Sequence, residues 1–146
     1  FRRVLFRSIV NNQNFSDSFS FRFTKCIIPF TYYNVTSNYN ILKINSGGVK
    51  TVTLTVGQYN ITQLLAALTT ALNALGVGIF TLTADPITYK ITITNGTTPF
   101  IYLGTQSTIN YITGFDFIDT PSALSQTAPF VYNLGGTDWI DIISKT

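Results

Sequence analysis

The side chains that could carry out catalysis or bind a metal are few, and their types limit the chemistry. The close carboxylate pairs are Asp116 with Asp119 and Asp138 with Asp141, and Cys26 is the single cysteine. The chain has no Glu and no His, so a Ser-His-Asp triad lacks its base and zinc lacks its commonest ligand. Calcium needs six or more oxygen ligands, so solvated loop aspartates are the favoured interpretation of the pairs. We therefore expect no catalytic, cofactor-binding or metal-binding residues and no enzyme activity.

The positive charge is concentrated at the N-terminus. The formal net charge is +3, and Arg2, Arg3 and Arg7 supply three of the nine cations. The segment FRRVLFRS at residues 1–8 back-translates to a nucleotide sequence that resembles the end of a short-read sequencing adapter. We interpret it as adapter read-through in a metagenomic assembly, with a basic N-terminal arm as the alternative. The other six cations balance the six aspartates and form no basic stripe between aromatics, so we expect no nucleic-acid partner.

The composition favours association with other proteins. Hydrophobic residues make up 45% of the chain and aromatics 14%, whereas charged residues make up only 10%, against about 25% in ordinary soluble domains. A chain with so little charge has little electrostatic repulsion to keep its copies apart. By length, residues 9–146 form a single domain, which we expect to be truncated at one or both ends.

One amphipathic helix is the element that must organise the core. Thr alternates with Val or Leu from residue 51 to 56, the pattern of a strand, and then apolar residues recur at helical spacing from 61 to 75. Asn60 and Gln63 are spaced as a capping box, and Gly76 is placed to end the helix. A helix of about 15 residues falls short of the roughly 20 apolar residues that cross a bilayer, so we expect no membrane span. The expected core residues are Leu64, Leu65, Leu68, Leu72 and Trp139.

Strands are expected along most of the remaining chain. Segments 15–25, 40–44, 78–84, 87–94, 100–103, 130–133 and 138–144 have strand patterns, and segment 108–112 reads as a short strand or one helical turn. The clearest hairpin joins 78–84 to 87–94 through the turn at Asp85-Pro86. Turns every 8 to 12 residues favour a sandwich. The predicted fold is mainly β, an antiparallel β-sandwich or jelly-roll-like domain with one amphipathic helix.

The order of several short motifs resembles a family of viral proteins. Tyr33-Asn34 after Pro29 comes first, and Gly57-Gln58-Tyr59 precedes the Leu-rich helix; Gly114-Phe115, Ala128-Pro129 and Asn133-Leu134 follow in that order. This series is similar to that of the minor structural proteins of eukaryotic double-stranded DNA viruses and virophages, over about residues 19–143.

The resemblance implies a virion component of the minor capsid, vertex or spike-base type. Such a protein is assembled inside the infected host cell and acts through contacts with other capsid proteins or copies of itself. We expect Tyr32, Tyr33, Phe115 and Phe117 to contribute to these interfaces, because aromatics are enriched at interface cores. The alternative is a carbohydrate- or receptor-binding β-sandwich of a viral or phage fibre or adhesin, in which exposed tyrosines stack on sugars.

Overall fold

The computed structural model describes residues 33–135. Several expectations lie outside this part of the chain: the read-through segment 1–8, the strands at 15–25 and 138–144, and the residues Cys26, Tyr32, Asp138, Trp139 and Asp141.

The first sheet has three antiparallel strands in the order β2-β1-β5, comprising β1 (Ile41–Asn45), β2 (Val49–Thr53) and β5 (Ile101–Tyr102). β1 and β2 form a hairpin whose turn contains two glycines with positive φ, Gly47 at 67° and Gly48 at 128°. Glycine adopts these angles without the steric penalty that other residues incur. Leu42 and Ile44 face the core, while Ile41, Lys43 and Asn45 are partly exposed, as the two-residue period of a strand requires.

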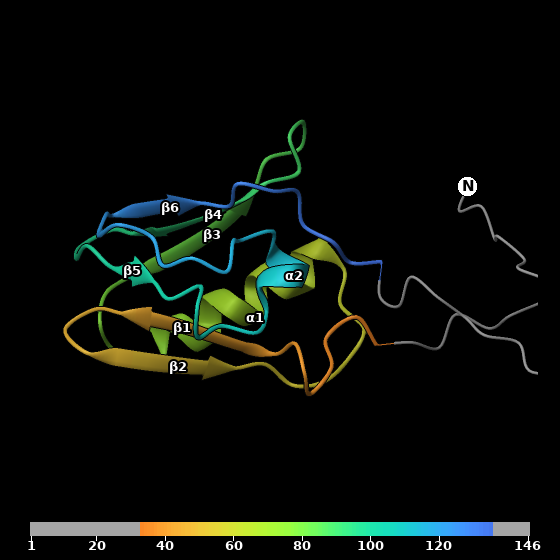
Figure 1. The fold of residues 1–146 in the computed structure, drawn as a ribbon, viewed down its shortest axis with the longest axis horizontal. Helices are drawn as coiled ribbons and strands as arrows, with labels where there is room; N and C mark the ends of the chain where they lie inside the picture. Colours follow the sequence, from red (N-terminus) through yellow and green to blue (C-terminus); the bar gives the residue numbers. More distant parts are fainter. Residues whose placement is uncertain (1–32, 136–146) are drawn as a thin grey trace, which may run out of the picture. The chain divides into compact units, whose positions relative to one another are not determined.

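The second sheet is also antiparallel, in the order β3-β4-β6, with β3 (Phe80–Ala84), β4 (Ile91–Asn95) and β6 (Ser125–Thr127). Its outer face carries hydroxyls: Thr92 pairs with Thr127 at 2.9 Å and Thr94 with Ser125 at 3.0 Å. Figure 1 shows the two sheets as two layers, with the β1-β2 hairpin on the opposite side of the domain from β3, β4 and β6.

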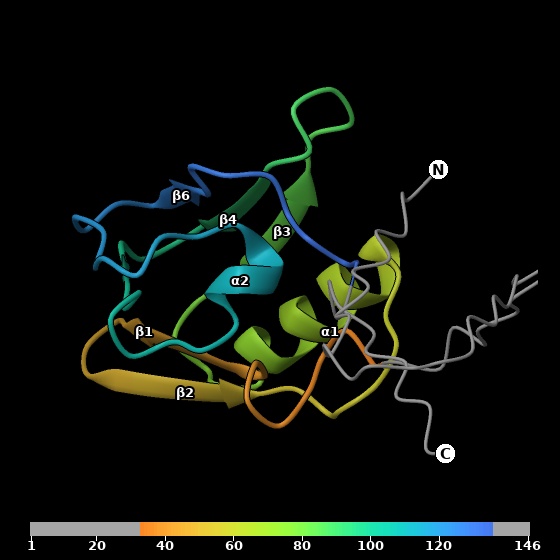
Figure 2. The same cartoon turned by 45° about the vertical axis from the view of Figure 1, so that its right-hand side comes forward.

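Helix α1 (Ile61–Asn73) follows β2 and leads into β3, and it lies between the two sheets in both views (Figures 1 and 2). Asn60 and Gln63 form the expected capping box, with Gln63 N donating to Asn60 Oδ1 at 2.9 Å and Asn60 N donating to Gln63 Oε1 at 3.0 Å. The helix ends two residues before the expected Leu75, and Gly76 beyond it has φ 67°. Residues next to each end of α1 in the sequence therefore determine where the helix begins and where it ends.

The two sheets are joined along the edge away from α1. Phe100, beside β5, forms a β-bridge with Ala123, just before β6; their backbone N–H groups donate to each other's carbonyls at 3.0 and 3.1 Å. The ring of Phe100 also packs edge to face on Phe80 of β3, with centroids 5.4 Å apart. The strands therefore run almost continuously from β2 through β5 and β6 to β3, and α1 packs between these two end strands.

The core is built from the inner faces of both sheets and one face of α1. Leu64, Leu68 and Leu72 are fully buried, and Leu65 is half buried at its margin. The short helix α2 (Asn110–Thr113) is the helical turn that was one of the two expectations for segment 108–112, and its Ile112 is buried in the core.

The structure confirms a mainly β fold with antiparallel strands and corrects several element boundaries. Residues 87–90 do not belong to the second hairpin strand, because the chain turns through residues 85–90 and β4 begins at Ile91. Residues 130–133 form no strand, whereas the unforeseen β6 pairs with β4. Val56 is exposed because β2 ends at Thr53.

Candidate functional site: exposed apolar surfaces

The loop between β3 and β4 projects beyond both sheets (Figure 1), and several hydrogen bonds support its turn. Asp85 Oδ1 accepts hydrogen bonds from the backbone N–H groups of Ile87 and Thr88 at 2.8 and 2.6 Å. Further backbone bonds join Tyr89 N to Asp85 O and Asp85 N to Lys90 O, at 2.9 and 3.0 Å. Tyr89 has φ 54°, the one positive value among non-glycine residues in the described part of the chain. The aspartate therefore organises the turn.

Exposed apolar side chains lie on this loop and on the chain segment that is hydrogen-bonded to it. Ile87 is 84% exposed, and Tyr89 and Val131 are also exposed. The C-terminal part of the described chain supports the loop, because Tyr132 N donates to Tyr89 O at 3.0 Å and the two rings meet edge to face with centroids 6.0 Å apart. We call Ile87, Tyr89, Val131 and Tyr132 the hairpin-tip surface. It presents two aliphatic side chains and two aromatic rings on a hydrogen-bonded backbone.

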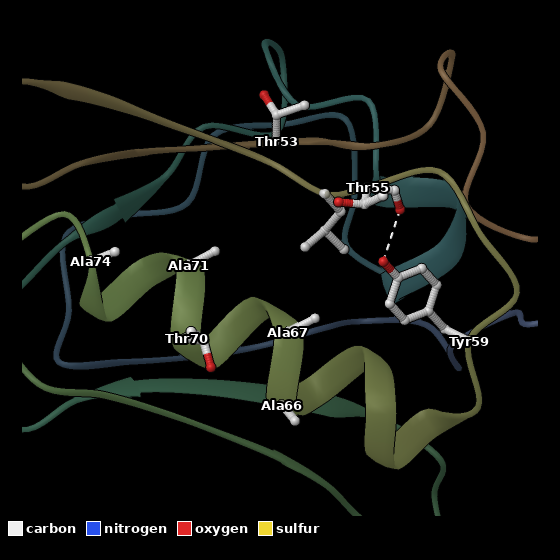
Figure 3. A pocket seen from close by; sticks show the side chains of 9 residues that line it. Thr53, Thr55, Tyr59, Ala66, Ala67, Thr70, Ala71 and Ala74 are labelled. Atoms are coloured by element: carbon white, nitrogen blue, oxygen red, sulfur yellow. Dashed lines mark hydrogen bonds between the residues drawn. The ribbon is translucent and has the colours of Figure 1, made fainter.

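A second apolar feature is an open groove of about 420 Å³ between α1 and the end of β2. Figure 3 shows Ala67, Ala71 and Ala74 on the side of α1 that faces the strand, with Tyr59 at one end. Tyr59 closes that end by donating from its hydroxyl to Thr55 O at 2.8 Å. None of the described residues that line the groove is charged; they are Thr53, Leu54, Thr55, Tyr59, Ala66, Ala67, Thr70, Ala71 and Ala74.

A third feature is a pair of partly exposed tyrosines. The rings of Tyr39 and Tyr111 lie 5.9 Å apart at an interplanar angle of 34°, and each side chain is nearly half exposed. Tilted aromatic faces of this kind can stack on the apolar face of a sugar or pack against a protein.

The structure separates the residues that were expected to form an interface. Tyr33 and Phe117 are more than half exposed and are available for contacts, whereas Phe115 is only 3% exposed. The ring of Phe115 stacks on Tyr102 with centroids 4.1 Å apart and an interplanar angle of 18°. Phe115 is therefore a core residue, and its expected interface role is corrected: its partner ring lies inside the same domain.

The hairpin-tip surface was missed because its residues carry a strand pattern. Ile87 and Tyr89 alternate with Thr88 and Lys90, which predicts an inward-facing apolar side. The signal that favoured a loop was Asp85-Pro86, since aspartate side chains hydrogen-bond to the backbone N–H groups that follow them.

Two motifs of the viral resemblance come together in space. Val35 and Gly57 form a β-bridge, and Asn34 pairs through its side chain with the backbone of Tyr59, accepting from Tyr59 N at 2.9 Å and donating to Tyr59 O at 2.7 Å. The Tyr-Asn and Gly-x-Tyr motifs therefore fix the start of the described chain beside the entry to α1.

The polar side chains that could have carried chemistry have structural partners. Asp119 Oδ1 accepts from the N–H and hydroxyl of Thr105 at 3.0 and 2.7 Å, and these bonds lower the pKa of Asp119. The Tyr102 hydroxyl donates to Asn110 Oδ1, and burial raises the pKa of this phenol. Within residues 33–135, no three His, Cys, Asp or Glu side chains lie close enough together to hold a metal ion. No helix in the same range has the length and apolar character to cross a membrane.

Comparison with known proteins gives a family without an assigned activity. The family described as "Family of unknown function (DUF5901)" matches residues 8–134. No curated protein and no solved structure matches the chain.

Proposed function

Because the chain belongs to the DUF5901 family of unknown function, we propose a function from its surfaces: a non-enzymatic virion structural protein, of the minor capsid or spike-base type. It acts through contacts with other capsid proteins or with copies of itself. The resemblance of its motif series to viral minor structural proteins supplies the viral setting, and the surfaces supply the mode of action.

The observation that supports this role best is the hairpin-tip surface. A loop that leaves an isoleucine 84% exposed forgoes about 1.5–3 kcal/mol of burial free energy within the monomer, which contact with a partner would recover. The turn is already ordered by Asp85, so binding requires little further loss of conformational entropy, and preorganisation raises affinity in this way. An aromatic and aliphatic centre is also typical of interface cores.

The test is the mass of the full chain in solution, measured by light scattering across concentration. We expect a defined oligomer, such as a trimer or pentamer, and we expect Ile87→Ser to shift it towards the monomer. Ile79→Ser is the matched control, because Ile79 is also exposed but lies at the opposite end of the β3-β4 hairpin. A wild-type chain that stays monomeric at high concentration would contradict the proposal.

The tyrosine pair supports a second candidate function, a carbohydrate- or receptor-binding module of a fibre or adhesin. Tyr39 and Tyr111 present two neighbouring rings at the surface. On a glycan array this candidate expects binding that Tyr39→Ala removes and Phe117→Ala leaves unchanged. Absence of glycan binding by the wild-type chain would exclude sugar as its ligand.

A further inference from the structure

We propose that the outer edge of β2 accepts an added β-strand, and that this strand is the alternating segment at residues 19–25 of a second copy of the chain. The inference rests on the proposed assembly function and names one of its contacts. In this mode of recognition, main-chain hydrogen bonds supply affinity and alternate side chains supply specificity.

The first support is the hydrogen-bonding state of the β2 edge. Leu54 N donates to Asn40 O at 2.9 Å, and bonded and non-bonded pairs alternate along an antiparallel ladder. The backbone N–H and C=O groups of Thr51 and Thr53 therefore make no hydrogen bonds with β1. They point to the side of β2 that faces away from β1. No backbone hydrogen bond involves these groups within residues 33–135. An edge of this kind is a template for a further strand.

The second support is the groove that lies along this edge. The side chains of α1 that border it are Ala or Thr, and three of the residues, Ala66, Thr70 and Ala74, are exposed. Large side chains at these positions would occupy the space that a neighbouring strand needs. The helix thus offers a platform of small side chains beside the free edge, suited to a strand that presents large apolar side chains on one face.

The outer edge of β3, on the other side of α1, differs from the β2 edge because it is hydrogen-bonded to the helix. There Asn73 binds both backbone groups of Phe80, at 2.7 and 3.1 Å, so a helix side chain occupies the position that a strand would take. No residue of α1 makes such bonds with Thr51 or Thr53 of β2 in the described part of the chain. The contrast makes β2 the favoured edge for strand addition.

The chain itself contains a segment of the required chemistry. Thirty-two residues precede the described part, and within them Phe19, Phe21 and Phe23 alternate with Ser20, Arg22 and Thr24. One face of such a strand would carry three phenylalanines that match the small, uncharged platform, with Lys25 following them at the end of the segment, and Arg22 would belong to the opposite face. A strand from a second copy would thereby join the two molecules.

The test combines light scattering with amide hydrogen exchange on the full chain. Thr53→Pro removes an outward N–H without touching the β1 ladder, as proline on an edge strand does, and Thr53→Val is its matched control with the N–H retained. Ala71→Leu fills the groove, and Thr62→Leu places the same side chain on an exposed position of α1 outside it. Thermal melts establish that each variant is folded.

We expect Thr53→Pro, Ala71→Leu and Phe21→Ser to lose this assembly contact, and the two controls to keep it. In the wild-type chain the Thr51 and Thr53 amides should exchange more slowly as concentration rises, because the protection comes from another copy.

Each contrary outcome has a distinct meaning. Assembly that survives Thr53→Pro and Phe21→Ser but is lost in Ile87→Ser would overturn the strand addition and leave the proposed function standing. Loss of assembly in the edge and groove variants, but not in Phe21→Ser, would reject segment 19–25 as the occupant. A monomeric wild-type chain would contradict both the proposed function and this inference.

Discussion

The side-chain amide of Asn73, at the last turn of α1, makes two hydrogen bonds with the backbone of Phe80 at the start of β3. Phe80 N donates to Asn73 Oδ1 at 2.7 Å, and Asn73 Nδ2 donates to Phe80 O at 3.1 Å. The amide thereby imitates a residue of a neighbouring strand and connects the helix to the second sheet. Asn34 binds the backbone of Tyr59 in the same way, so the fold uses this device at both ends of α1.

Asn73→Ala removes both bonds and leaves the N–H and C=O of Phe80 without their protein partner. We expect the free energy of unfolding to fall by about 1 kcal/mol, the usual net contribution of such hydrogen bonds, because water reaches this partly buried site. Urea denaturation measures the change. Thr62→Ala, an exposed substitution on the same helix, should stay within about 0.5 kcal/mol of wild type; equal effects of the two variants would contradict the proposed role of Asn73.

Leu68→Ala removes a fully buried side chain from the centre of α1. The expected loss of stability is about 2–5 kcal/mol, since the substitution combines lost burial with a cavity. Leu65→Ala is the informative comparison and should cost less, because Leu65 is only half buried. A loss under about 0.5 kcal/mol for Leu68→Ala, measured by chemical denaturation, would show that this face of the helix is not in the core.

Phe115→Ala and Phe117→Ala should separate stability from surface contacts. Phe115 stacks on Tyr102 in the interior, so its truncation should cost about 3–5 kcal/mol. Phe117 is 60% exposed, and its truncation should change stability by no more than about 0.5 kcal/mol. Thermal and urea unfolding of the two variants, two positions apart with the same chemical change, provide the measurement. A similar cost at both positions would contradict the assignment of Phe115 to the core and Phe117 to the surface.

The Asp85 turn should make stability depend on pH in the acid range. Hydrogen bonds from the backbone N–H groups of Thr88 and Ile87 lower the pKa of Asp85 from its usual 3.8. A carboxyl group with a lowered pKa in the folded state contributes stability that is fully present above its unfolded pKa and is lost as the pH falls through its folded pKa. We therefore expect the stabilising effect of this carboxylate to be constant above about pH 5 and to disappear towards pH 2.

Asp85→Asn is the variant that isolates this effect, because its side-chain oxygen still accepts a hydrogen bond but carries no charge. The difference in melting temperature between wild type and this variant should narrow as the pH falls from 5 to 2. A difference that stays constant over this range would show that ionisation of Asp85 does not stabilise the turn.

Features that depend on neighbours along the chain were predictable from the sequence. The capping box of Asn60 and Gln63, the positive φ of Gly76 and the buried stripe of α1 each follow from spacing within a few residues. The β1-β2 and β3-β4 hairpins follow for the same reason, since their strands are separated by short turns and carry alternating patterns.

Tertiary contacts decided which apolar residues face a partner and which face the core. Ile87 and Phe115 both belong to hydrophobic stretches, yet the Asp85 turn leaves Ile87 exposed and Tyr102 buries Phe115. The three-residue strand β6 has almost no local signal and exists because β4 offers it an edge. The amino-acid composition alone determined that the chain carries little charge and offers no His or Glu side chain for catalysis or metal binding. The arrangement of the free β2 edge beside the small side chains of α1 was decided by the tertiary fold, because burial and strand pairing join residues far apart in the chain.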